Sequence, residues 1–212
     1  MDEQSIDIPC PICNASGNVK MIAHVDEIPY FGEHTQVTVQ CHDCGWRQTD
    51  FIPAEGKKPG GCSLLIDSPD LLSARVVRSS SCTVRLPELD LQVNPGSNST
   101  GYVSNVEGVL NRFVDIINLV KRGHEAELIE ADSSESREEL MGELSTLNEM
   151  LARIESLKRP KTIDAVTIEL LDPHGHSLIL HENTVERELT EAELRELPVG
   201  PDPAVFSQDD MN

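Results

Sequence analysis

Apolar and polar residues alternate in short runs through the first half of the chain. Two such runs, Asn18–Ile28 and Thr35–Val39, flank a turn at residues 29–33. A segment rich in Pro, Gly and Lys follows at 53–61, and after it come four more runs: Cys62–Ile66, Ala74–Arg78, Thr83–Leu86 and Leu89–Val93. A period of two with frequent turn residues is typical of antiparallel strands, so we expect a β layer or a sandwich.

The period changes to that of a helix near residue 104. Ser104 and Glu107 have the spacing of a capping box. Apolar residues then recur at intervals of three and four, at Val106, Val109, Leu110, Phe113, Ile116, Ile117 and Val120. Two basic residues followed by Gly123 predict the end of this helix.

A second helix is predicted to begin between Asp132 and Ser136, about ten residues after the first. Its apolar stripe is narrow and consists of Leu140, Leu144, Leu147, Leu151 and Ile154. The two helices form a predicted hairpin over about residues 104–159. The stripe has two interpretations, because it could pack on the first helix or serve as a docking face for a partner.

The last part of the chain returns to strand character and then becomes acidic. Ala165–Leu171 and Ser177–His181 flank a turn at residues 172–175, and Thr190 has the position of a cap on a short helix. Residues 186–212 are rich in Glu and Pro, so we expect an acidic, partly disordered tail.

Four of the six cysteines form two C-x-x-C pairs, Cys10 with Cys13 and Cys41 with Cys44, and 27 residues lie between the pairs. Two thiolates three residues apart on a tight turn can face one ion, and a hairpin would bring both turns together. Gly45 follows the second pair, where glycine lets backbone N–H groups approach the sulfurs. The spacing predicts one zinc ion held by all four cysteines in a zinc-ribbon module.

A site made of four cysteines leaves no coordination position for water or substrate, so we expect a structural zinc ion. Two disulfides, or iron in place of zinc, remain as alternatives. Cys62 and Cys82 have no partner spacing, and Cys82 is expected to be a small buried thiol. We interpret His174, His176 and His181 as residues of a hairpin tip and a strand rather than as metal ligands.

The charge excludes several classes of partner. The chain has 37 Asp and Glu against 17 Lys and Arg, a net charge of −20, and no dense basic cluster that could bind nucleic acid or an anionic membrane. No run of 18 apolar residues is present, and the first residues lack the basic and apolar regions of a signal peptide. We therefore expect a cytoplasmic protein that binds neither nucleic acid directly nor membranes.

Several motifs resemble those of the ZPR-type zinc finger family. The two cysteine pairs bracket Ile28-Pro29-Tyr30-Phe31-Gly32-Glu33, and Arg85-Leu86-Pro87-Glu88-Leu89-Asp90-Leu91 matches a second family motif, as do 106–110 and 171–177. These motifs cover roughly residues 8–185 once, whereas eukaryotic family members carry the unit in tandem. The chain therefore looks like the single-copy archaeal form. Cys82 and the acidic tail depart from the family pattern.

The resemblance implies an α+β fold in three parts. A four-cysteine zinc-ribbon module would occupy residues 1–58. A β-rich domain, like a double-stranded β-helix or sandwich and carrying the helical hairpin, would occupy 59–185, and the acidic tail 186–212.

The resemblance also implies a function. Eukaryotic members bind translation elongation factor one-alpha and assist its folding, so we expect a zinc-binding protein that binds a translation GTPase of this class. Ile28, Pro29, Tyr30 and Phe31 are the candidate partner-binding residues, because apolar residues on a turn are common in interaction sites. Packing of Tyr30 and Phe31 on the protein's own β domain is the alternative.

Two other classes of function are weighed against this one. The first is a zinc-ribbon adaptor of the transcription or RNA machinery, although the net charge disfavours direct contact with nucleic acid. The second is an enzyme, and here the chain shows no nucleophile elbow or phosphate-binding loop. We expect a binding protein rather than an enzyme.

Overall fold

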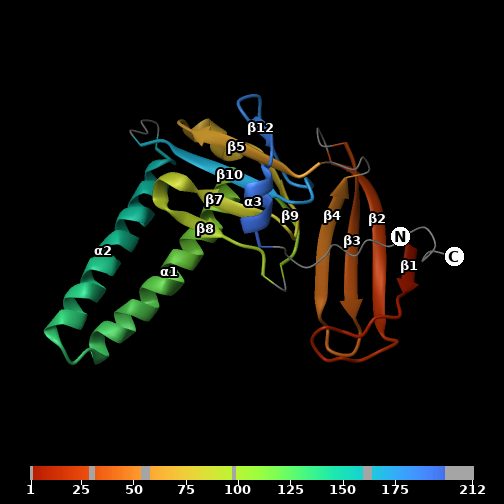
Figure 1. Cartoon of the computed structure of the whole chain (residues 1–212), viewed down its shortest axis with the longest axis horizontal. Coiled ribbons are helices and arrows are strands. Elements are labelled where there is room, and N and C mark those ends of the chain that lie inside the picture. The colour runs from red at the N-terminus through yellow and green to blue at the C-terminus, as the bar shows by residue number, and fades with distance from the viewer. Residues whose placement is uncertain (1, 29–31, 54–57, 97–98, 160–163, 199–212) are drawn as a thin grey trace.

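The computed structural model describes residues 2–28, 32–53, 58–96, 99–159 and 164–198. Three parts lie in a row (Figure 1): a β-sheet module at one end, a β-rich domain in the middle, and a helical hairpin projecting from the other end. Within the described ranges, no helix is long and apolar enough to cross a membrane.

The N-terminal module is a four-stranded antiparallel sheet in the order β1-β2-β3-β4. Its strands are β1 (Asp2–Ser5), β2 (Val19–Ile28), β3 (Gly32–Cys41) and β4 (Arg47–Pro53). The two predicted strands are present as β2 and β3, which pair from Val19 opposite Cys41 to Ile28 opposite Gly32. A small core of Cys10, Val19, Met21, Val37, Val39 and Cys41 holds the module together.

The middle domain contains two further antiparallel sheets, in the orders β12-β5-β10-β7-β8 and β11-β6-β9. The strands are β5 (Gly60–Ile66), β6 (Arg75–Arg78), β7 (Thr83–Leu86), β8 (Leu91–Val93), β9 (Tyr102–Asn105), β10 (Val166–Asp172), β11 (Leu178–Leu180) and β12 (Val185–Glu188). Short 3-10 helices occupy Pro69–Ser73 and Pro87–Leu89. The predicted α+β class with a β-rich, sandwich-like domain is confirmed.

One aliphatic core joins the two sheets and the hairpin. It includes Leu64 of β5, Val76 of β6, Ile168 of β10 and Ile179 of β11, all of which are buried. Such alternating inward-facing residues explain why short runs of period two were visible in the sequence.

The hairpin consists of α1 (Val106–Glu130) and α2 (Ser134–Ser156). Val109, Phe113 and Ile117 of α1 are buried, and Leu147 and Leu151 of α2 pack against the same core. Leu147 and Leu151 belong to the apolar stripe of the second helix. This part of the stripe packs within the protein, as predicted by the interpretation that did not require a partner.

Two details of the hairpin differ from the prediction. The N-cap is Asn105 rather than Ser104, and its side chain accepts a hydrogen bond from the Gly108 N–H at 2.8 Å, because β9 stays paired with β6 as far as Asn105. The first helix also continues through Gly123 to Glu130, which leaves only residues 131–133 as the connection.

The fold continues beyond residue 185, where the acidic tail was expected to begin. β12 pairs with β5, and α3 (Glu191–Glu196) follows with a capping box between Thr190 and Glu193. Leu189 and Leu197 are buried against Leu171 of β10. Residues 199–212 of the expected tail lie outside the described residues.

Three consecutive serines connect the module to the β-rich domain, and we refer to Ser79–Ser81 as the serine clamp. Ser80 donates from its N–H at 2.9 Å and from its hydroxyl at 2.5 Å to the carboxylate of Asp50, at the end of the module nearest the domain. Ser79 and Ser81 donate at 2.7 and 2.8 Å to the buried carboxylate of Asp172. Ser80 thus binds an acid of the module, whereas Ser79 and Ser81 bind an acid of the β-rich domain.

Candidate metal centre

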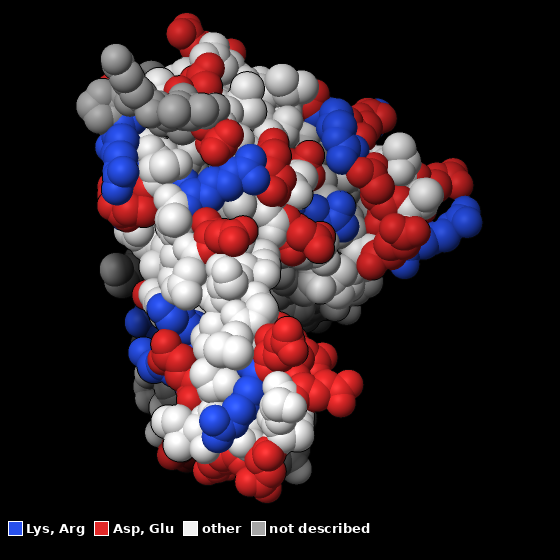
Figure 2. All heavy atoms as spheres, turned by 90° about the vertical axis from the view of Figure 1, so that its left-hand side faces the viewer, with Lys and Arg blue, Asp and Glu red and all other residues white. Residues whose placement is uncertain are grey.

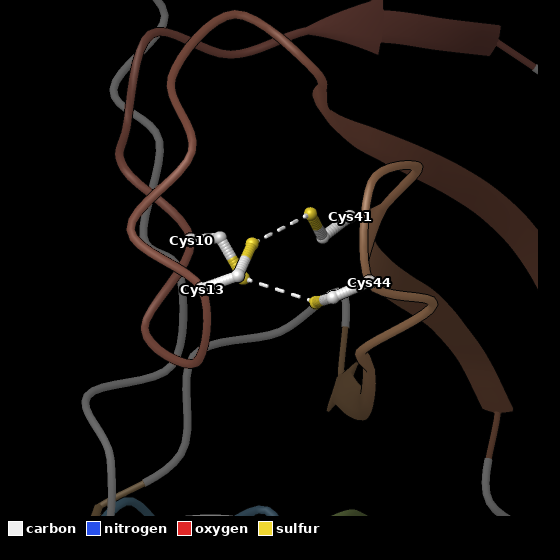
Figure 3. Close-up of side chains that lie close together, drawn as sticks. All are labelled: Cys10, Cys13, Cys41 and Cys44. Carbon is white, nitrogen blue, oxygen red and sulfur yellow. Dashed lines mark hydrogen bonds between the residues drawn. The ribbon is translucent and has the colours of Figure 1, made fainter.

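Four cysteine sulfurs converge at one end of the N-terminal sheet (Figure 3). Cys10 and Cys13 lie on the loop before β2, Cys41 ends β3, and Cys44 lies on the loop before β4. All four sulfurs lie within 4.8 Å of one another, and the Cys10–Cys44 and Cys13–Cys41 sulfurs are each 3.7 Å apart. Sulfurs around a tetrahedral zinc ion, with Zn–S of about 2.3 Å, lie about 3.8 Å apart. The four cysteines therefore fit one zinc ion.

The two loops use the same turn. Asn14 donates its N–H to the Cys10 carbonyl at 2.8 Å, and Gly45 donates its N–H to the Cys41 carbonyl at 3.0 Å. Each donor lies four residues after the first cysteine of its pair and has a left-handed backbone, with φ of 57° at Asn14 and 76° at Gly45. Asn and Gly adopt this conformation more readily than other residues, so the local sequence favours both turns.

Each pair presents one sulfur to the interior and one to the surface. Cys10 and Cys41 are buried in the small core, whereas Cys13 and Cys44 are exposed. The inner cysteines therefore link the metal centre directly to the packing of β2 and β3.

The thiols do not ionise independently. Burial raises the pKa of Cys10, but the N–H groups of Cys13 and Ile12 lower it, with a net value of about 7. For Cys13, the Ala15 N–H lowers the pKa, while burial and the neighbouring thiols raise it to about 12. Several thiolates in one cluster repel one another, and a divalent cation relieves that repulsion.

The donor set decides what such a site can do. All six cysteines are free thiols, which speaks against the disulfide alternative. Four sulfur ligands complete a tetrahedron, so a zinc ion held here is structural and contributes to folding rather than to chemistry.

The structure separates this site from the predicted partner-binding turn. Ile28 ends β2 opposite Gly32. The cysteines lie at the opposite end of this hairpin, whose two strands are ten residues long. At a rise of about 3.4 Å per residue, that distance is about 30 Å. Pro29, Tyr30 and Phe31 lie outside the described residues.

Cys82 and the backbone of the His174–His176 turn have structural positions. Cys82 is fully buried, and its thiol donates to the Thr83 carbonyl at 3.3 Å; burial raises its pKa well above the ordinary range. The backbone N–H groups of His174 and His176 bind the Asp172 carboxylate at 2.9 and 3.0 Å, as expected for a hairpin tip.

The sequence pattern missed an exposed apolar surface on the hairpin. Ile116, Leu119 and Val120 of α1 are 43%, 62% and 41% exposed, and we call these three residues the α1 ridge. Two of them were predicted to lie on the buried face of the helix. Residues 106–156 carry twelve Asp and Glu against five Lys and Arg, and at this end of the molecule uncharged surface lies between acidic side chains (Figure 2).

Comparisons with known proteins agree with this architecture. Residues 4–58 match the model of the ZPR1 zinc-finger domain, and residues 70–196 match that of the ZPR1 jelly-roll domain. The first match contains the four cysteines, and the second contains most of the β-rich domain and the hairpin.

Related proteins occur in archaea and eukaryotes. A ZPR1-like protein of Methanocaldococcus jannaschii is 37% identical over 193 residues, which are 91% of this chain and 89% of that protein. A ZPR1-like protein of Pyrococcus horikoshii is 36% identical over 192 residues, 91% of this chain and 80% of that protein. The zinc finger chaperone zpr1 of Schizosaccharomyces pombe is 26% identical over 83% of this chain but only 35% of its own length. The chain belongs to the ZPR1 family of zinc-finger proteins.

Proposed function

We propose that this chain is a zinc-dependent, cytoplasmic binding protein of the chaperone type, and that its client is a translation GTPase of the elongation factor one-alpha class. The observation that carries the proposal is the α1 ridge, an exposed apolar surface on a helix of a chain whose relative is named a zinc finger chaperone.

The ridge has the properties that client binding requires. Residues spaced by three and four on one helix form a continuous apolar face, which is the usual contact surface of a helix in a partner's groove. The hairpin as a whole carries twelve Asp and Glu against five Lys and Arg, and this acidic excess favours a partner with a basic face. This surface would recognise apolar segments that are still exposed on an incompletely folded client.

The zinc module would contribute in a different way. Its metal centre stabilises one end of the β2–β3 hairpin, and Ile28 and Gly32, which flank residues 29–31 in the sequence, are paired at the other end. We expect the apolar residues between these two positions to contact the client. Zinc is then required for binding although it lies about 30 Å from the contact.

Capture of the purified elongation factor from the same organism tests the proposal. We expect wild-type protein to retain the factor during its refolding, and the double variants Leu119→Ser/Val120→Ser and Tyr30→Ala/Phe31→Ala to retain at least tenfold less. Met141→Ser is the matched control, because Met141 is an exposed apolar residue of α2 outside the ridge. Equal retention by all four proteins, or none by wild type, would refute the proposed client.

A further inference from the structure

A small pocket lies between strands β7 and β8 and the N-terminal half of α1. The strands and the helix are neighbours in Figure 1. Its volume is about 180 Å³. Half of its lining residues are apolar and include Val93, Phe113 and Ile116, and the other half are polar and include Arg78, Tyr102 and Arg112. An apolar cavity of about 150 Å³ can hold benzene, so this space suits a branched group of five or six carbons.

Arg112 carries a charge at this pocket that the protein does not neutralise. Its guanidinium lies 4.0 Å from the centre of the Tyr102 ring. Within the described part of the chain, Arg112 makes no ion pair or hydrogen bond, and the Tyr102 hydroxyl makes no hydrogen bond. Stacking on an aromatic ring orients a guanidinium while its N–H groups stay available for a ligand.

Arg78 adds a second positive charge beside the first. It is only 6% exposed, and it donates to the carbonyls of Cys82 at 2.7 Å and Thr100 at 3.2 Å and to the Ser99 hydroxyl at 2.8 Å. All three acceptors are neutral. A buried cation bound only to neutral acceptors leaves a positive potential around it.

This concentration of positive charge is unusual for the chain. The net charge is −20, yet within the described residues neither Arg78 nor Arg112 forms an ion pair with a carboxylate. Two arginines that line the same pocket as several apolar side chains, and that make no ion pair within the described residues, match a ligand with one negative group and one apolar group.

We propose that the pocket between β7, β8 and α1 binds a carboxylate that carries a small branched apolar group. The planar fork of Arg112 would bind the carboxylate through two hydrogen bonds, and the Tyr102 hydroxyl would donate a third. The apolar group would lie against Val93, Phe113 and Ile116. Inorganic phosphate lacks an apolar part and would gain nothing from that wall.

Such a carboxylate has two sources, a free branched-chain acid or the C-terminal residue of a polypeptide. Ile116 lines the pocket and also belongs to the α1 ridge, so a polypeptide bound on the ridge could place its end in the pocket. The inference does not depend on the proposed client, because it rests on the two arginines and the pocket alone.

Titration of the zinc-loaded protein, followed by NMR of labelled Tyr, Phe and Ile side chains, tests the inference. We expect saturable shifts of Tyr102, Phe113 and Ile116 with 4-methylpentanoate, at a dissociation constant of about 1 mM for so few ligand atoms. The neutral 4-methylpentanamide, acetate and inorganic phosphate should each bind at least tenfold more weakly. N-acetylglycyl-leucine and its C-terminal amide repeat the comparison for a polypeptide end.

Protein variants assign the binding to the pocket. Arg112→Gln should weaken 4-methylpentanoate binding at least tenfold, and Tyr102→Phe about tenfold, because one hydrogen bond to a charged group is lost. Arg122→Gln on the same helix is the matched control and should bind like wild type. Equal binding of acid and amide, unchanged binding by Arg112→Gln, or an absence of saturable shifts would overturn the inference. Tighter binding of the peptide than of the free acid identifies a polypeptide end as the source.

Discussion

The zinc module and the β-rich domain are both made of antiparallel sheets, but their cores differ greatly. The module buries a cluster of six residues, and two of these are cysteines of the metal centre. Among the described residues, the largest cluster of the β-rich domain contains 22 buried residues and extends from both sheets to the hairpin. A small core rarely stabilises a fold alone, so the module depends on its metal, whereas the domain can fold without one.

The junction joins regions of unequal stability. Asp50 belongs to the module and Asp172 to the domain, and the serine clamp binds both. Local unfolding of the module would therefore break the bonds of Ser80 but leave those of Ser79 and Ser81.

Cys44→Ser should remove the zinc ion and unfold the module only. A structural zinc site contributes about 10 to 16 kcal/mol of apparent binding free energy, and a serine hydroxyl is a poor substitute for a thiolate ligand. We expect elemental analysis to find no zinc and limited proteolysis to cut within β2 and β3. Cys82→Ala is the control, and it should retain one zinc ion per chain. A zinc-loaded, protease-resistant Cys44→Ser protein would contradict the prediction.

Leu110→Ala should destabilise the β-rich domain without loss of zinc. Leu110 is fully buried between α1 and the sheets, and its truncation should lower the free energy of unfolding by about 2 to 5 kcal/mol. Leu119→Ala, on the exposed α1 ridge, should change it by less than about 0.5 kcal/mol. Urea unfolding followed by circular dichroism compares the two, and equal midpoints would show that the assigned core is wrong.

Asp50→Asn should weaken the junction rather than either region. The amide offers one acceptor atom in place of two, so a Ser80 donor loses its partner at a cost of about 1 to 3 kcal/mol. Unfolding of the module and of the domain should then separate into two transitions. Asp26→Asn, an exposed acid of β2, is the control. A single unchanged transition in Asp50→Asn would show that the clamp does not couple the regions.

Stability should decrease as the pH falls, in two steps. Burial lowers the pKa of His176, so the unfolded chain takes up a proton near pH 6.5 that the folded chain does not, and stability falls below that pH. Burial raises the pKa of Asp172, but the hydroxyls of Ser177, Ser79 and Ser81 lower it more, so its contribution is present above about pH 4 and is lost below. His176→Asn should abolish only the first step in urea midpoints measured across this range.

Much of the architecture could be predicted because it is encoded locally. The cysteine spacing indicates the metal site, and the alternating runs indicate β5, β6, β7 and β10. The capped helix after Thr190 was also predicted, because a capping box involves only four residues.

Contacts between distant residues account for most of what was missed. Gly123 was predicted to end α1, but Lys121 donates to Asn148 at 2.8 Å, and the Nδ1 of His124 lies 3.2 Å from a carboxylate oxygen of Glu143 across the hairpin. Such contacts and the packing of α2 offset the cost of about 1 kcal/mol for glycine inside a helix. The serine clamp could not be predicted either, because Ser79 and Asp172 are 93 residues apart in the sequence.

Hydrogen exchange of the wild-type protein, with and without a zinc chelator, tests the unequal stability of the two regions most directly. We expect the amides of β2 and β3 to lose protection when zinc is removed, while those of β5 and β10 keep theirs. Equal loss of protection in both regions, or no loss in the module, would contradict the claim that only the module depends on zinc for its stability.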